Sequence, residues 1–211
     1  MIVTLDQHLL ERIESLYAEM ERSYDSVAAS IGHTCTGCPD NCCDSYFLHF
    51  TYIEWSYLWH GMNRLEPEKQ HHIISRARNY EERCEQLLAR GERPRIMCPL
   101  NEDGRCILYD HRLMVCRTHG VPAQMTRPDG RKLTFPGCFR CQELVERHRS
   151  EHVSAVMERT PLLQQLVALE QRLLEGKKGL MPKVRMTIAG MLIAGPPAVP
   201  HCSDRLTVRN K

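Results

Sequence analysis

Cysteine is the residue type that most constrains what this chain can fold into. Eleven of its 211 residues are cysteines, and four of these lie between Cys35 and Cys43. An odd number of cysteines excludes complete disulfide pairing within one chain. The first residues include Asp6, Glu11 and Glu14 and show no secretory signal pattern, so we expect a cytoplasmic protein with reduced thiols. In that compartment a dense cysteine pattern is more typical of a metal site than of disulfides.

The composition narrows the classes of partner. Hydrophobic residues make up 42% of the chain and charged residues 26%, which is typical of a folded globular protein. The formal net charge of +2 argues against a strongly cationic nucleic-acid or membrane binder. The longest late apolar stretch, residues 186–200, is too short to span a bilayer and contains Gly and Pro. We therefore expect neither a nucleic acid nor a membrane as partner, and the sequence identifies no particular protein partner.

Helical periodicity dominates outside the cysteine-rich segments. Apolar residues that recur at steps of three or four predict the first helix, which Gly32 ends. Thr51 and Glu54 form a capping box for the second helix, and Pro67 suits the first turn of the third. The predicted helices cover about residues 5–31, 51–61, 66–90, 137–148 and 160–175.

These patterns predict a mainly α fold. We expect a helical single domain with a loop-rich, metal-stapled cysteine core and a small β-hairpin, whose turn lies at residues 127–131. The expected organisation is an N-terminal helix (1–33), a cysteine-cluster metal-binding domain (34–149), a C-terminal helix packing on the same domain (150–180) and an irregular tail (181–211).

Nine of the 11 cysteines fall in loops or loop-like junctions and are the candidate metal ligands. They are Cys35, Cys38, Cys42, Cys43, Cys98, Cys106, Cys116, Cys138 and Cys141. Two C-x2-C pairs, at 35–38 and 138–141, each bring two sulfurs within reach of one metal, because the intervening residues reverse the backbone. Cys84 on a charged helix is expected to be a small packing residue, and Cys202 is not expected to be a ligand.

The number of candidate thiols leaves the ligand set open. A structural zinc site and a [4Fe–4S] cluster each use four ligands. One site would leave five of the nine thiols unexplained, whereas two sites would use eight and leave one. The vicinal Cys42 and Cys43 point to opposite faces of an extended backbone, so they fit different irons or different sites better than one zinc ion. His49, His111 and His119 are possible substitute ligands, although each is more simply a surface or core histidine.

Three features favour an iron–sulfur cluster of the [4Fe–4S] type over zinc. These are the excess of cysteine over histidine, the vicinal pair, and the Cys-Pro junctions at Cys38 and Cys98. The arginines beside candidate ligands are Arg105, Arg112, Arg117 and Arg140. Arginine stays protonated and can hydrogen-bond thiolate or sulfide sulfur, so these side chains could offset the negative charge of a bound centre. A solvated basic face is the alternative.

The cysteine segments resemble a known family. Residues 35–43, CTGCPDNCC, are similar to the opening motif of the CxxCxxCC family of zinc- or iron-chelating proteins, also called YkgJ-type cysteine-cluster proteins. Residues 98–117 resemble the family's second motif, through Cys98, Cys106, Tyr109, Arg112 and Cys116. The chain departs from the family at two places. Three residues rather than two precede the vicinal pair, and Leu113 stands where the family often has Pro.

This resemblance covers about residues 35–141 and implies metal chelation through the cysteines. The leading hypothesis is an accessory, redox or metal-handling metalloprotein. Some relatives are flagellin lysine-N-methylases, which adds protein-lysine methylation as a second hypothesis. The chain has no G-x-G and little strand pattern, so the residues themselves give that hypothesis little support. A zinc-stabilised interaction module is the third. No catalytic residue is identified, because ligation by Cys116 is preferred to a nucleophile pair with His119.

Overall fold

The computed structural model describes residues 2–36, 38, 42–147 and 155–199. Its α-helices are α1 (Gln7–Ser30), α2 (Tyr52–Met62), α3 (Pro67–Ala89), α4 (Met114–Thr118), α5 (Phe139–Arg147), α6 (Thr160–Leu173) and α7 (Ile188–Ile193). Its strands are β1 (Asn101–Glu102), β2 (Arg105–Cys106), β3 (Ala123–Thr126), β4 (Lys132–Phe135) and β5 (Met157–Glu158), and its 3-10 helices are η1 (Cys42–Asp44), η2 (Tyr109–His111) and η4 (Lys178–Leu180). Helices of all kinds take up 54% of the described residues, which confirms the predicted mainly α class.

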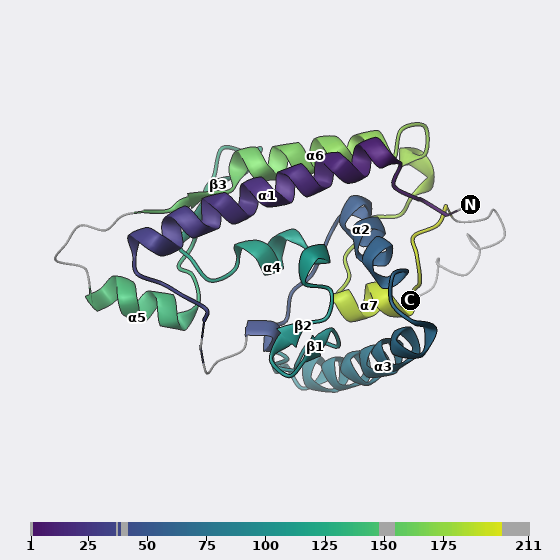
Figure 1. The fold of residues 1–211 in the computed structure, drawn as a ribbon, viewed down its shortest axis with the longest axis horizontal. Coiled ribbons are helices and arrows are strands. Elements are labelled where there is room, and N and C mark those ends of the chain that lie inside the picture. The colour runs from purple at the N-terminus through teal and green to yellow at the C-terminus, as the bar shows by residue number, and fades with distance from the viewer. Residues whose placement is uncertain (1, 37, 39–41, 148–154, 200–211) are drawn as a thin grey trace.

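The N-terminal helix α1 has a capped start and one apolar face. The side chain of Asp6 accepts a hydrogen bond from the backbone N–H of Leu9 at 2.7 Å, which satisfies a donor that the first turn leaves unpaired. The buried residues of the helix are Leu9, Ile13, Leu16, Tyr17, Met20, Val27 and Ala28. This face packs on α6, and Figure 1 shows the two helices side by side along one edge of the molecule.

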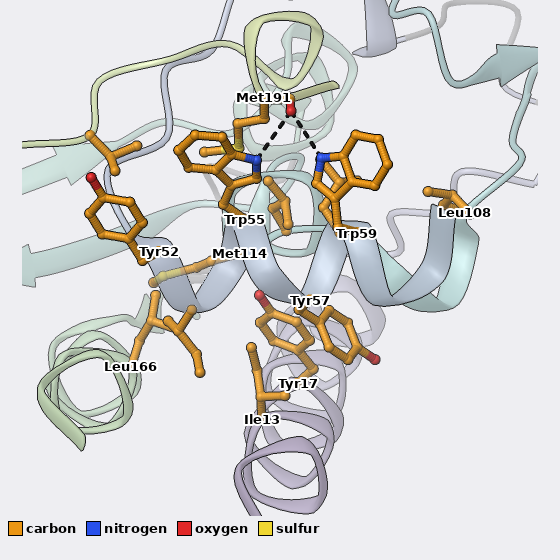
Figure 2. Packing of buried hydrophobic residues seen from close by; sticks show 14 of the residues in the cluster. Ile13, Tyr17, Tyr52, Trp55, Tyr57, Trp59, Leu108, Met114, Leu166 and Met191 are labelled. Carbon is orange, nitrogen blue, oxygen red and sulfur yellow. Dashed lines mark hydrogen bonds between the residues drawn. The ribbon is translucent and has the colours of Figure 1, made fainter. Parts of the chain in front are cut away.

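Helix α2 lies in the middle of the molecule, and all of its residues except His60 are buried. Trp55 and Trp59 lie one turn apart, and both donate their indole N–H to the carbonyl oxygen of Met191, at 3.1 and 3.0 Å (Figure 2). A buried indole N–H is costly to leave unpaired, so these two bonds fix where α7 lies against α2. A helix that is buried all round becomes the element on which the others pack.

The described part of the expected irregular tail contains a helix, so the prediction for residues 181–211 is corrected there. Thr187 caps α7 by accepting a hydrogen bond from Gly190 N at 2.9 Å, and its hydroxyl also bonds Glu81 on α3. Ala189, Met191 and Leu192 are buried, and α7 packs along α3. Six residues span less than two turns, which is too short for helical periodicity to stand out in the sequence. Residues 200–211, with Cys202, lie outside the described residues.

The start of α2 agrees with the capping-box prediction in position but not in its bonds. Thr51 is the N-cap residue, yet its hydroxyl donates to Glu54 Oε2 at 2.7 Å rather than capping the backbone. The backbone N–H groups of Tyr52 and Ile53 instead donate to the carboxylate of Glu170 on α6, at 3.0 and 2.8 Å. A carboxylate from another helix thus takes the place of the local cap.

The described strands are short, with two or four residues each. The predicted hairpin is present as β3 and β4, which pair antiparallel, and β5 adds to β3 in parallel. A second antiparallel hairpin joins β1 to β2 and places Asn101 opposite Cys106. Among the helices within the described ranges, none is long and apolar enough to cross a bilayer.

A buried histidine should make the fold sensitive to acid. His49 is 2% exposed, burial lowers its pKa to about 4, and its Nδ1 has no hydrogen-bond partner among the described residues. In the unfolded chain His49 binds a proton near pH 6.5, whereas in the folded chain it does so only near pH 4. The free energy of unfolding should therefore fall as the pH drops from about 6.5 towards 4.

We expect His49→Phe to remove about 2–3 kcal/mol of this acid-induced loss. Chemical denaturation at a series of pH values measures it, with the exposed His72→Phe as control. Parallel stability–pH curves for wild type and His49→Phe would contradict the assignment.

Candidate metal centre

The structure gathers the candidate cysteines into two neighbourhoods and joins none of them by a disulfide. Ten cysteines lie in the described residues, and none of these is disulfide-bonded. The central group consists of Cys43, Cys98, Cys106 and Cys116. The distal group consists of Cys35, Cys38, Cys138 and Cys141. The remaining candidate, Cys42, lies between the two groups.

Backbone pairing between two distant loops assembles the central group. Cys98 N donates to Cys43 O at 2.9 Å, so η1 lies directly against the segment that precedes β1. The hairpin of β1 and β2 then turns Cys106 back towards Cys98, since Ile107 N donates to Leu100 O at 2.8 Å. Helix α4 supplies Cys116.

The thiols of the central group influence one another's ionisation. Burial raises the pKa of Cys116 to about 12, and the neighbouring Cys106 and Cys43 add to this rise. Burial likewise raises the pKa of Cys106 to about 11 and that of Cys98 further. Each of these three thiols lies within electrostatic range of Cys43. Burial and the neighbouring Cys43 thus oppose the ionisation of three half-buried thiols, and a bound cation would relieve that cost.

Hydrogen-bond donors already face these sulfurs. The backbone N–H of Leu100 bonds to the Cys98 sulfur, and that of Leu108 bonds to the Cys106 sulfur, and each bond favours the thiolate. The pattern is the same at both sites, with the donor two residues beyond the cysteine.

Cys43 has the strongest support for a negative charge. A hydrogen bond from Cys42, with help from Asn101 and Arg112, lowers the Cys43 pKa to about 6. The Nδ2 of Asn101 is buried, and the Cys43 sulfur is the partner that it approaches. This donor beside Cys43 was not evident from the sequence, because Asn101 resembles an ordinary turn residue there.

The central arginines differ in what they do. Arg112 and Arg117 lie within electrostatic range of Cys106 and favour its thiolate. Arg117 is buried, stacks over the Tyr17 ring at 4.4 Å, and donates to the backbone oxygens of Arg112 and Asp110. It thereby holds the loop that leads into α4. Arg105 is exposed.

The distal group joins the loop after α1 to the start of α5. Cys38 N donates to Cys35 O at 3.2 Å, which closes the C-x2-C turn as the spacing predicts. The hydroxyl of Tyr24 lies 3.6 Å from the Cys35 sulfur, and burial, Cys35 and Cys138 together raise the Tyr24 pKa. Burial and Cys138 raise the pKa of Cys141 to about 11.

Cys42 has contacts with both groups. Its hydrogen bond to Cys43, together with burial, raises its pKa, and Cys35 and Cys116 both add to the rise. Cys42 is thus the ninth candidate ligand, which remains when the other eight are divided into two groups of four.

The histidines proposed as substitute ligands are placed in packing roles. His49 is in the core, His111 stacks on Tyr57 with ring centroids 4.8 Å apart, and His119 meets the Phe47 ring edge-on at 5.1 Å. The histidine that does approach a candidate sulfur is His33, whose Nε2 lies 3.9 Å from Cys35. Cys84 is 1% exposed within the hydrophobic cluster, in agreement with the packing role predicted for it.

Neither group of cysteines has the geometry of a metal coordination shell. Within the ranges that the structure describes, no three histidine, cysteine or carboxylate side chains form a group that could hold a metal ion as they stand. Comparisons with known proteins add no relative, since no protein-family model, curated protein or solved structure matches the chain. The resemblance to the CxxCxxCC family therefore stays a prediction.

A buried carboxylate positions the helix that carries Cys116. Glu54 is 4% exposed, and its Oε1 accepts the first backbone N–H of α4, from Met114, at 2.8 Å. Burial raises the Glu54 pKa above 4.5, so the folded state binds its proton more tightly than the unfolded state. The stability that this protonation gives is present below the unfolded pKa and is lost as the pH rises through the folded pKa.

Two substitutions separate the charge of Glu54 from its bonds. Glu54→Gln keeps an acceptor for Met114 and should hold the free energy of unfolding at pH 7 within about 1 kcal/mol of wild type. Glu54→Ala leaves that N–H unpaired and should cost about 2–3 kcal/mol. Denaturation curves between pH 4.5 and 8 measure both effects. Equal losses in the two variants would show that the bond to α4 is unimportant.

Proposed function

We propose that the chain is a metalloprotein whose central group binds a [4Fe–4S]-type iron–sulfur cluster. The observation that carries this proposal is the convergence of Cys43, Cys98, Cys106 and Cys116, from three separate segments, with N–H donors already on three of the sulfurs. A set of four thiolates supplies one ligand for each iron of such a cluster.

The groups around the central cysteines suit a negatively charged, thiolate-bound metal centre. Backbone N–H groups, the side-chain amide of Asn101 and the guanidinium groups of Arg112 and Arg117 all lie beside the sulfurs. Hydrogen bonds to ligand sulfur stabilise the thiolate form and raise the reduction potential of a cluster. Zinc bound by four thiolates also carries net negative charge, so these donors support metal binding in general and the cysteine-only ligand set favours the cluster.

The side chains have distinct roles in this proposal. Cys43, Cys98, Cys106 and Cys116 would hold the irons, and the N–H donors would orient three of their sulfurs. When bound, the cluster would supply one-electron redox chemistry. Binding would require these sulfurs to move closer together than they lie here, and η1, the β1–β2 hairpin and α4, which carry three of them, are short elements. An accessory redox or metal-handling role follows from such a centre.

Metal analysis of protein purified without oxygen tests the proposal. We expect a brown protein with visible absorption and equal amounts of iron and acid-labile sulfide. Cys106→Ser and Cys116→Ser should each lose most of this iron, since each removes one of four ligands from the same cluster. Cys84→Ser is the matched control, because Cys84 lies in the core, and it should keep its iron.

Two results would contradict the cluster. One is a colourless wild-type protein with zinc at the central cysteines and no iron after anaerobic reconstitution with iron and sulfide. The other is retention of full iron by both Cys106→Ser and Cys116→Ser. Circular dichroism of each variant shows whether a loss of iron comes from a lost ligand or from a lost fold.

A further inference from the structure

Helices α1 and α6 leave a groove between them at the surface of the molecule. The two helices lie side by side (Figure 1), and the groove has a volume of about 450 Å³. Its walls include the small side chains of Ser15 and Ala168, which leave the space open, and the buried Leu16 and Leu169 form its floor. A cavity of this size falls within the range of about 300–1,000 Å³ that is usual for small-molecule sites.

The charged side chains that line the groove are basic. His8 and Arg12 come from α1 and Arg172 comes from α6, and of the described lining residues none is a carboxylate. Within the described ranges, neither arginine has an ion-pair partner. Arginine stays protonated at any pH that a folded protein tolerates. The groove therefore holds two guanidinium charges, one from each helix, that no protein carboxylate offsets.

Local helix electrostatics explains one of these arginines but not the other. Arg172 lies in the last turn of α6, where the helix dipole favours a cation. Arg12 lies in the second turn of α1, and the residues three and four positions from it are His8, Leu9, Ser15 and Leu16. None of these offers a carboxylate to Arg12 along the helix. Two like charges in one groove repel each other, and a bound anion would remove that cost.

The other end of the groove has a different chemistry. There the side-chain amide of Gln165 donates to Glu19 Oε2 at 3.1 Å. Gln165 lies seven residues before Arg172, and Glu19 lies seven residues after Arg12, which is about 10 Å along each helix. Glu19 disfavours a negative charge at this end. A ligand in the groove would thus place its anionic group between the arginines and a neutral polar group near Gln165 and Ser15.

From this arrangement we propose that the groove binds a small phosphomonoester, whose phosphoryl group is held between Arg12 and Arg172. A phosphomonoester carries about −1.5 to −2 charges at pH 7 and three acceptor oxygens, so it can bond two guanidinium groups at once. A carboxylate has one charge and is matched by a single arginine. The neutral end and Glu19 favour a compact ligand with a hydroxylated body over an extended acidic peptide. The proposal uses none of the candidate cysteines and does not depend on metal binding.

Titration with inorganic phosphate and with glucose 6-phosphate tests the site. Backbone amide NMR signals of the full chain, recorded at constant ionic strength with chloride, should shift and saturate with both probes around Arg12 and Arg172. Glucose 6-phosphate should bind at least about fivefold more tightly than phosphate, because its sugar covers apolar floor and can bond Gln165. Glucose alone should cause no saturable shift.

Three single variants separate the groove from general surface charge. Arg12→Gln and Arg172→Gln should each weaken the binding of glucose 6-phosphate at least about tenfold, since each removes one charge-assisted hydrogen-bonding group. Arg22→Gln is the matched control, because Arg22 is an exposed arginine of α1 that does not line the groove. It should bind as wild type does. Without a probe, Arg12→Gln should melt at the wild-type temperature or higher, because it loses a repulsion.

Several results would overturn the proposal. One is the absence of saturable shifts with either probe up to about 50 mM, which would exceed a millimolar dissociation constant many times over. Another is equal weakening by Arg22→Gln, which would indicate non-specific attraction. A lowered melting temperature of Arg12→Gln with unchanged affinity would assign this arginine to the fold. Tighter binding of a phosphoserine peptide than of glucose 6-phosphate would replace the small ligand with a phosphorylated protein.

Discussion

The burial of α2 is the constraint on which the rest of the structure depends. A helix with water on none of its faces must satisfy its polar atoms through its neighbours, and each such bond fixes one neighbour in place. The two indoles fix α7 through Met191, and Glu170 brings α6 to the N-terminus of α2. Glu54 likewise accepts a hydrogen bond from Met114 N and so positions α4, the helix that carries Cys116. Glu54 and Tyr57, whose hydroxyl donates to Asp110 O, therefore both tie α2 to the segment that carries Cys116.

The thiols lie at the edge of this helical scaffold. Cys98 and Cys106 pack against the hydrophobic cluster from outside and are partly buried, whereas Cys141 is buried away from it. Burial raises the pKa of each of these thiols, which keeps them protonated in the absence of a cation. A metal bound by these thiolates would have to displace their protons, so its affinity would increase with pH.

Short sequence patterns predicted the helices and turns that form within a few residues. The features that depend on contacts between distant segments could not be predicted in this way. The amphipathic α1 and the hairpin turn before Lys132 follow from periodicity and turn chemistry within a short window. The C-x2-C turn at Cys35 is equally local. The pairing of Cys43 with Cys98 is not, because it depends on how two loops more than 50 residues apart meet over the helices.

The residues that sequence reasoning missed share a cause. Tyr24, His33 and Asn101 each carry an unremarkable side chain in an ordinary helix or turn, and they gain importance from the sulfur that the fold brings to them. Glu54 was identified as a helix cap, and it does lie at that helix end, but its second oxygen serves α4. One side chain can satisfy a local pattern and a distant contact together, and the sequence displays the first of these roles alone.

The candidate cysteines lie outside the hydrophobic cluster, so under the proposed function the helical scaffold would fold independently of metal binding. The cluster joins buried residues of α1, α2, α3, α6 and α7, and the cysteine that it includes from these helices is Cys84, which is no candidate ligand. Structural zinc modules that have no such core unfold without metal, because ligation supplies their folding free energy. Here the helices can bury their apolar surface without any guest. If the central group binds a metal as proposed, its loss should loosen the loops around Cys43 and Cys98, while the tryptophan contacts to Met191 persist.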